Sequence, residues 1–335
     1  MLEQAHTDVL VIGAGIAGLM AARTLTEQGL KVIVVERGEV PGGRMTTLQI
    51  GPGRADHGAQ FITAHTPEFQ IRVNRWQDEG LCFQWSTGWS SGSLGTIPAD
   101  GNPRYAVRGG MFRLAAHLAE GLDVRLNSRI TVVSQQTKGW LALDEKGRVY
   151  SAPCVLLAIP VPLALQLLRT GQVVLNPTDR AALESIYYEP CLAGIFWING
   201  EVRLPDPGAL QQINAPVAWI ADNRRKGVSP EATLITVHAG ASYSRELWHL
   251  PDWQALVALE SPLKRYIDYD AEIALRHLER WTHAMPAQPY PAHYLLAADL
   301  PGLVFAGDSF GRASVEGAAL SGLAAAQALV ETARR

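Results

Sequence analysis

Three glycines and one glutamate near the N-terminus have the types and order needed to hold two linked phosphates and a ribose. Gly13, Gly15 and Gly18 follow the apolar run Val9–Ile12, and Glu36 closes the next apolar run. In such a turn the first glycine permits a tight bend, the second admits a pyrophosphate, and the third lets a helix pack on the strand. The helix start offers N–H groups to phosphates, and the acid accepts hydrogen bonds from ribose hydroxyls. The pattern predicts a dinucleotide site that includes Gly13, Gly15, Ile16, Ala17, Gly18, Glu36 and Arg37.

Two further segments indicate which dinucleotide is bound. Gly43 and Arg44 supply a flexible backbone and a cation beside the phosphates, in a turn that NAD binding does not need. Near the other end, Gly307 and Asp308 follow the apolar run Leu303–Phe305 and precede a helix. A helix N-terminus aimed at a flavin stabilises the negative charge that develops on reduction. These segments favour FAD, and the candidate cofactor residues they add are Gly43, Arg44, Gly307, Asp308, Glu316, Gly317 and Ala318.

These motifs also carry a family resemblance. The N-terminal fingerprint, Gly42–Thr47, Ala55–Thr63 and the pair Gly307-Asp308 together resemble the renalase-like flavoproteins, a branch of the amine-oxidase-like FAD superfamily. The resemblance implies noncovalent FAD and oxidation of dihydronicotinamide dinucleotides that carry the extra hydride on ring carbon 2 or 6. It implies NAD(P)⁺ as the product, with O₂ as the electron acceptor and H₂O₂ formed from it. It also implies that the backbone of Ile130 contacts the adenine.

The part of this resemblance that discriminates best is the run from Asp56 to Thr63. The chain stretch that contains it is expected to pass beside the flavin ring. The cofactor-binding candidates in this run are His57, Gly58, Ala59, Gln60 and Phe61. For His57, a histidine satisfied by backbone hydrogen bonds is as good an interpretation as a proton-handling role.

No motif for a nucleophile, a metal or paired carboxylates is visible in the chain. Hydride transfer from a dihydropyridine needs none of these, because it requires only a donor carbon stacked on the flavin in a dry pocket. Trp281 resembles a residue that walls the substrate site in related oxidases, although ordinary core packing is an alternative. His238 and Tyr243 are expected in a strand-end loop of the kind that carries site residues. The catalytic candidates are Gln60, Phe61, His238, Tyr243 and Trp281.

Two departures from the amine-oxidase pattern bear on the choice between functions. No cysteine lies near Gly307–Ala319, so a covalent flavin link is not expected there. No strand-borne lysine of the kind that holds a water at the flavin is evident, since Lys226 and Lys264 are interpreted as surface charges. An amine oxidase or a desaturase-like dehydrogenase with another acceptor remains the alternative enzyme. A non-catalytic flavin-binding module is the alternative of a different class.

The elements that must position these residues predict an α/β fold, with a doubly wound, Rossmann-like FAD-binding domain and a second, mixed-sheet α+β substrate domain. The FAD-binding domain is expected to comprise residues 1–66, 107–160 and 275–335, and the substrate domain 67–106 and 161–274. A β-meander is predicted from the alternation at Val124–Leu126, Ile130–Val133, Trp140–Leu143 and Arg148–Tyr150. Helices near 162–169 and 177–186, and strands near 190–198, 216–221 and 232–238, are assigned to the substrate domain. Most tryptophans of that domain are interpreted as core residues.

Composition sets outer limits on function. The chain has 335 residues, 47% hydrophobic and 18% charged, as in ordinary globular proteins, and this length favours two domains. A net charge of −3 gives no reason to expect nucleic acid or an anionic membrane as a partner. No apolar run is long enough to cross a bilayer, and the early first strand leaves no room for a signal peptide. The expected location is cytoplasmic, with Cys82, Cys154 and Cys191 reduced and buried.

Overall fold

The computed structural model describes residues 4–91, 101–212 and 214–333. The chain forms two compact units. The first comprises Met1–Gly43, Leu114–Tyr188 and Met285–Arg335, and the second comprises Arg44–Arg113 and Glu189–Ala284.

These boundaries differ from the expected ones. Residues 44–66, 107–113 and 275–284 fall in the second unit, and 161–188 fall in the first. The hairpin of β4 (Thr47–Ile50) and β5 (Gly53–Asp56) explains the first difference, because its apolar side chains pack on the second unit's sheet. The helices α4 (Val161–Thr170) and α5 (Pro177–Glu184) explain the last, because their buried side chains join the first unit's core.

The first unit is built on a six-stranded sheet in the order β19-β20-β13-β2-β3-β9. Its parallel strands are β2 (Val9–Ile12), β3 (Val32–Val35), β9 (Asp123–Arg125), β13 (Cys154–Leu157) and β20 (Leu303–Phe305), with β19 (Leu295–Leu296) antiparallel at one edge. Every residue of β2, β3 and β13 is buried, as expected of central parallel strands covered on both faces. The predicted Rossmann-like, α/β class is confirmed.

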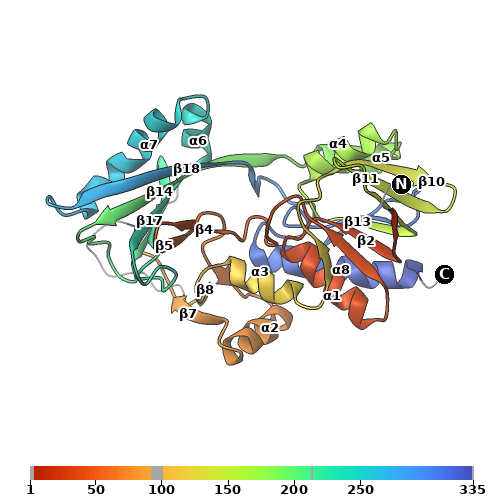
Figure 1. The fold of residues 1–335 in the computed structure, drawn as a ribbon, viewed down its shortest axis with the longest axis horizontal. Coiled ribbons are helices and arrows are strands. Elements are labelled where there is room, and N and C mark those ends of the chain that lie inside the picture. Colours follow the sequence, from red (N-terminus) through yellow and green to blue (C-terminus); the bar gives the residue numbers. More distant parts are fainter. Residues whose placement is uncertain (1–3, 92–100, 213, 334–335) are drawn as a thin grey trace. The chain divides into compact units, whose positions relative to one another are not determined.

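Two helices lie side by side on one face of this sheet (Figure 1): α1 (Ile16–Glu27) and α8 (Val315–Ala333). A Cβ added at Gly322 of α8 would lie 2.1 Å from the carbonyl oxygen of Ala17 in α1. The glycine therefore allows a backbone approach that no larger residue would permit.

The other face carries a second, four-stranded sheet in the order β1-β12-β11-β10. It comprises β1 (Gln4–His6), β10 (Ile130–Gln136), β11 (Gly139–Asp144) and β12 (Val149–Ala152), and three of its strands form the predicted meander. The assignment of Val124 to the meander is wrong, because Val124 pairs with Val34 at the edge of the six-stranded sheet. A three-residue strand with partly exposed side chains carries too little pattern to specify its sheet.

The second unit contains a five-stranded sheet in the order β15-β16-β17-β14-β18. Its strands are β14 (Tyr188–Asn199), β15 (Ala209–Gln211), β16 (Val217–Asp222), β17 (Thr233–Ala239) and β18 (Glu272–Pro286). One face packs on α7 (Asp252–Glu260), followed by the 3-10 helix Ser261–Tyr266, with α6 (Ala241–Leu247) nearby (Figure 1). The unit also holds β6 (Ile62–Thr63), α2 (Pro67–Asp78), β7 (Cys82–Ser86), β8 (Arg104–Val107) and the start of α3 (Phe112–Ala119).

Successive side chains of β17 point to opposite faces of this sheet, and the two faces have different contacts. Ile235 and Val237 point into the core shared with α7, whereas Leu234 packs on the β4–β5 hairpin. Thr236 and His238 share the face of Leu234, because strand side chains alternate with a period of two. The hairpin and the turn after it therefore lie over polar side chains of β17.

Within the part of the chain that the structure describes, we find no helix with the length and apolar character needed to cross a membrane. The same residues contain no group of three or more His, Cys, Asp or Glu side chains arranged to hold a metal ion. The three cysteines are unpaired; Cys82 and Cys154 are buried as expected, but Cys191 is only half-buried.

Candidate active site

The predicted phosphate turn has the geometry that its glycines imply. Gly13 has a φ of 106°, and a Cβ there would lie 2.6 Å from the carbonyl oxygen of Ala158. A Cβ at Gly18 would lie 2.0 Å from the carbonyl oxygen of Gly13, so both positions require glycine. At Gly15 a Cβ would meet no heavy atom within 4 Å, which leaves open space directly over the start of α1.

Glu36 lies at the end of β3, beside this turn. Its Oε2 accepts a hydrogen bond from the backbone N–H of Ala14 at 2.9 Å, and its Oε1 accepts one from Gly38 N–H at 2.8 Å. The second glycine turn is joined to the first, because Gly42 N–H donates to Ala14 O at 2.8 Å. Two backbone N–H groups thereby hold the Glu36 carboxylate beside the turn. Arg37, the next residue, is exposed.

The C-terminal candidates gather where β20 leads to α8. A Cβ at Gly307 would meet no heavy atom within 4 Å, whereas one at Gly317 would lie 1.9 Å from Arg312 O. Gly307 N–H donates to Ser321 Oγ at 2.8 Å, which ties the strand end to α8. Asp308 is half-buried and Glu316 is fully buried, with Ala318 beside it. Two open glycine positions and the N-termini of two helices fit a dinucleotide.

Ile130 is the remaining cofactor candidate of the first unit. Its side chain is 8% exposed and belongs to the core under the meander, and its residue position pairs with Asp144. Any adenine contact would therefore come from its backbone, as the resemblance implies.

Asp56, the last residue of β5, is a buried centre of hydrogen bonds in the second unit. Its Oδ1 accepts from Thr47 Oγ1 at 2.5 Å and from Met111 N–H at 2.8 Å. Its Oδ2 accepts from Lys226 Nζ at 2.7 Å, and both of these side chains are completely buried. The backbone N–H of Asp56 donates to Asn223 Oδ1 at 3.1 Å. The charge is fully partnered, which is the condition under which a carboxylate is tolerated in an apolar interior.

The interpretation of Lys226 as a surface charge is wrong. It lies in the turn between β16 and β17 as expected, yet its ammonium sits 5.2 Å from the centre of the Trp85 ring. Burial lowers the pKa of Lys226, and the Asp56 carboxylate opposes that shift. A lysine in a polar turn gives no sequence signal for a buried partner 170 residues away. Lys264 is exposed as expected, with 66% of its side chain accessible.

Gln60 is tied into the same network. Its Nε2 donates to Asp56 O at 2.7 Å and to Gly58 O at 3.1 Å, and its Oε1 lies 3.5 Å from Lys226 Nζ. The side chain is 6% exposed. Both donor hydrogens of the amide are used inside the turn, so Gln60 shapes the segment that contains it.

The other side of this turn rests on Arg44. A Cβ at Gly58 would lie 2.0 Å from Arg44 O, and Ala59 N–H donates to the same oxygen at 2.8 Å. The Arg44 guanidinium Nη1 donates to the carbonyl oxygens of His283 and Ala284 in β18 at 3.3 and 3.1 Å. Arg44 therefore links the turn to the end of β18.

Three predicted residues meet around one carbonyl group. Trp281 Nε1, from β18, donates to His57 O at 3.0 Å, and His238 Nε2 lies 3.1 Å from the same oxygen. The Trp281 and His57 rings stack with centroids 5.4 Å apart. Burial lowers the pKa of His57, although the nearby Glu279 carboxylate opposes this, and burial lowers the pKa of His238 to about 4. Both imidazoles are neutral at neutral pH.

Neither His238 nor Tyr243 lies in the strand-end loop expected for them. His238 is inside β17, and Tyr243 is in α6, where it packs against the apolar core between the sheet and α7. Burial raises the pKa of Tyr243. The structure places His238 beside the His57 carbonyl group, whereas Tyr243 is a packing residue.

The pKa of His238 predicts how stability depends on pH. A folded-state pKa of about 4 against an ordinary value of 6.5 means that only the unfolded chain takes up this proton between those values. The contribution of His238 is therefore complete above pH 6.5 and is lost as the pH falls to about 4. His238→Gln should flatten the pH dependence of the urea midpoint in this window. An unchanged slope would show that other groups govern it.

Four aromatic side chains form a cluster that sequence analysis did not assemble: Phe61, Trp85, Trp89 and Trp219. Phe61 lies 5.1 Å from Trp89 and 5.5 Å from Trp219, and Trp85 lies 4.7 Å from Trp89, measured between ring centroids. Trp219 pairs with His238 across β16 and β17, so the aromatic cluster adjoins the His57 group. Its members come from three distant segments, and no single segment shows the pattern. Trp253, by contrast, is 65% exposed and is not a core residue.

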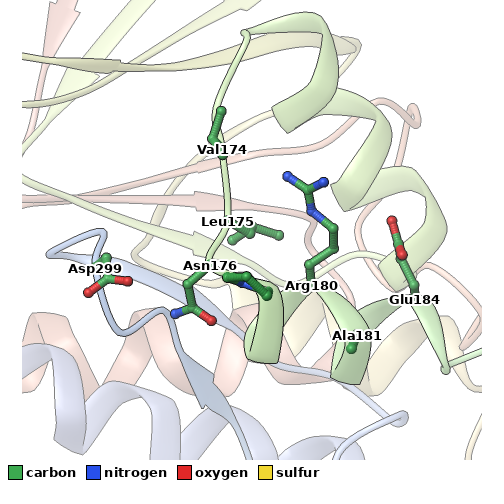
Figure 2. A pocket seen from close by; sticks show the side chains of 8 residues that line it. Val174, Leu175, Asn176, Arg180, Ala181, Glu184 and Asp299 are labelled. Atoms are coloured by element: carbon green, nitrogen blue, oxygen red, sulfur yellow. The ribbon is translucent and has the colours of Figure 1, made fainter.

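The first unit carries a surface hollow of about 570 Å³. Figure 2 shows it beside the start of α5, with the Arg180 guanidinium and the Glu184 and Asp299 carboxylates around it. No predicted site residue lines it. Its charges are mixed in sign and nothing in its lining resembles a cofactor site.

Comparison with known proteins defines the family. Residues 77–330 match the model described as flavin containing amine oxidoreductase, and residues 11–78 match an NAD(P)-binding Rossmann-like domain. The chain therefore belongs to the flavin containing amine oxidoreductase family, and FAD is its cofactor.

Individual relatives match less of the chain. It is 25% identical to polyamine oxidase 4 of Oryza sativa subsp. japonica over 240 residues, which is 65% of this chain and 47% of that protein. It is 45% identical to hydroxyneurosporene desaturase of Rhodobacter capsulatus over 60 residues, 18% of this chain and 12% of that one. The chain thus matches less than half the length of either relative.

Solved structures show the same fold at low identity. Wild-type putrescine oxidase bound to putrescine aligns with a TM-score of 0.71 and 17% identity, covering 98% of this chain and 100% of that one. A putative protoporphyrinogen oxidase from Exiguobacterium sp. 255-15 aligns with a TM-score of 0.72 and 15% identity, covering 99% and 100%.

Proposed function

We propose that this flavoprotein is a renalase-like oxidase of isomeric dihydronicotinamide dinucleotides in the cytoplasm. The first unit binds FAD without a covalent link, and the second unit supplies the substrate groups. The donor loses a hydride from ring carbon 2 or 6 and becomes NAD(P)⁺. Bound FAD would supply the two-electron acceptor for that hydride, and O₂ with two protons would take up the two electrons as H₂O₂.

The observation that carries this proposal is the segment Asp56–Phe61, which carries the family resemblance and brings Phe61 into the aromatic cluster. Lys226, expected as a surface charge, is buried beside this segment. Lys226 Nζ lies 2.7 Å from Asp56 Oδ2 and 5.2 Å from the centre of the Trp85 ring, which belongs to the aromatic cluster. An aromatic face attracts a cation by its quadrupole. Lys226 occupies this position beside Trp85, which supports a donor without an ammonium group.

The protonation states around His57 agree with such a donor. A protonated amine must lose a proton before it can give up a hydride, and a side chain that takes this proton needs a suitable pKa. His238, with a pKa of about 4, is far too weak a base for an alkylammonium ion. A dihydronicotinamide needs no deprotonation, so Phe61, Trp281 and neutral imidazoles suffice to orient it and exclude water.

The second candidate is an amine oxidase or a desaturase-like dehydrogenase with another electron acceptor. The match to polyamine oxidase 4 over 65% of the chain supports the first form, and the short match to hydroxyneurosporene desaturase supports the second. In either case Trp281, stacked on His57, would be part of the substrate wall.

Anaerobic stopped-flow mixing tests the proposal. The yellow protein is mixed separately with 2- and 6-dihydro-NAD(P), ordinary 4-dihydro-NADH, and primary and polyamines, and the visible flavin band is followed. Fast bleaching by a 2- or 6-isomer alone, with H₂O₂ on admission of air, is the expected result. Bleaching by amines alone would replace the proposal with the second candidate. Bleaching by no small-molecule donor would contradict both and favour a flavin-binding module.

Release of the flavin checks that FAD is noncovalent. Burial raises the pKa of Cys82 and Cys154 to about 11 and that of Cys191 to about 12, so all three thiols are protonated and unreactive. Acid precipitation should leave all the yellow colour in the supernatant. Flavin fluorescence that stays with the denatured chain on a gel would show a covalent link.

A further inference from the structure

We propose that Lys226 and Asp56 are positioning residues that hold the segment Asp56–Phe61 in one conformation through the side chain of Gln60. This inference rests on the proposed function in one respect only, namely that the segment passes beside the flavin ring. The contacts that hold this conformation all lie within the second unit.

The Lys226–Asp56 ion pair fixes the start of the segment. The two carboxylate oxygens of Asp56 face different elements: Oδ1 bonds Thr47 in β4 and Met111 before α3, and Oδ2 bonds Lys226 in the β16–β17 turn. The carbonyl oxygen of Asp56 also accepts from Thr236 Oγ1 of β17 at 2.8 Å. Residue 56 is therefore held from four sides, and its carboxylate cannot turn without leaving Lys226 unpaired.

The Lys226–Asp56 ion pair also fixes the orientation of the Gln60 side-chain amide. Its Nε2 must face the carbonyl oxygens of Asp56 and Gly58, because only a donor can bond to them. Its Oε1 must then point the opposite way, toward the Lys226 ammonium at 3.5 Å. Lys226 thus contacts both ends of the turn, the carboxylate at residue 56 and the amide at residue 60.

The turn between residues 56 and 60 carries groups of the candidate site. Between these two anchors lie His57, whose carbonyl oxygen binds Trp281 and His238, and Gly58, which lies against Arg44 O. Directly after them comes Phe61 of the aromatic cluster. A shift of the turn would move the His57 group and the aromatic ring together, so the ion pair acts on the site without touching a substrate.

Hydrogen–deuterium exchange in the FAD-loaded protein tests the positioning role directly. The double variant K226M/D56N removes both charges, so it leaves no unpaired buried ion. We expect amide exchange in the peptide spanning residues 56–63 to be at least about tenfold faster, with no change in the β2–α1 peptide. Lys264→Met, at an exposed lysine, is the matched control and should change the exchange rate of neither peptide. Unchanged exchange at 56–63 in the double variant would overturn the proposal.

A second variant covers the case in which the double variant fails to fold. Gln60→Leu removes only the amide and leaves the ion pair intact, and it should accelerate exchange in the same peptide. Protection equal to the unmodified protein would overturn the role of Gln60 as the link.

Kinetics with the donor that bleaches the flavin then separate this inference from the proposed function. In K226M/D56N we expect kcat to fall about tenfold, roughly 1.4 kcal/mol in the barrier, while KM changes little. K226R, which keeps the charge, should recover part of the loss. Faster exchange with an unchanged kcat would support the positioning role and contradict the placement of the segment beside the flavin.

Discussion

Replacing Lys226 alone with methionine is expected to lower the free energy of unfolding by about 3–5 kcal/mol, because it leaves the Asp56 carboxylate buried without its partner. Both side chains are inaccessible to water, so solvent cannot compensate for the lost ion pair. The measurement is urea unfolding of the FAD-free protein. FAD binds only the folded state and would add its own stabilisation, so it is left out.

The matched control is Lys264→Met. Lys264 also pairs with a carboxylate, Glu260, at 3.5 Å, but its side chain is 66% exposed. The Glu260 carboxylate keeps Arg276 as its partner at 2.7 Å, and a pair with an exposed lysine contributes about 0–1 kcal/mol, so this variant should unfold almost as the unmodified protein does. The double variant K226M/D56N should recover most of the stability lost in the single one, since neither charge remains. If K226M were as stable as K264M, the buried ion pair would not contribute to the stability of the second unit.

Replacing Gly15 with alanine is expected to weaken FAD binding by about tenfold to a hundredfold, or about 1.4–2.8 kcal/mol, and to leave the fold intact. A Cβ there meets no heavy atom within 4 Å, and the backbone (φ −70°, ψ 174°) suits any residue. The added methyl group would occupy the space that a pyrophosphate needs. Flavin fluorescence titration gives the affinity, and urea unfolding without FAD gives the stability.

Gly18→Ala is the contrasting variant. Its Cβ would lie 2.0 Å from Gly13 O, so α1 must move away from the turn. This variant should lose stability as well as FAD binding, whereas Gly15→Ala should lose binding alone. Equal FAD affinity for Gly15→Ala and the unmodified protein would contradict the assignment of this turn to the cofactor.

How far the sequence predicts this structure depends on whether the signal is local. The strands β2, β3 and β13 were predictable because a parallel strand buried on both faces must be apolar throughout. The tight turn at Gly13 and Gly18, with Glu36 beside it, was predictable because this strand–turn–helix motif has fixed spacings in a short stretch of chain. The match to the flavin containing amine oxidoreductase family agrees with the prediction of an FAD-binding fold.

What the sequence did not reveal depends on tertiary contacts. Lys226 lies in a polar turn, and only the fold shows that the turn closes over Asp56. The aromatic cluster joins Phe61, Trp85, Trp89 and Trp219, which are separated along the chain. The helix α4 is amphipathic, and its pattern fits any apolar surface, so its place in the first unit could not be read from it.

A competition experiment tests the proposed chemistry most directly. The FAD-loaded protein is incubated in air with equal concentrations of 6-dihydro-NAD and a polyamine such as spermidine, and the products are separated by chromatography. The proposal predicts NAD⁺ and H₂O₂ in equal amounts, with the polyamine recovered unchanged. Consumption of the polyamine to an aldehyde, with the dihydronicotinamide left intact, would contradict it.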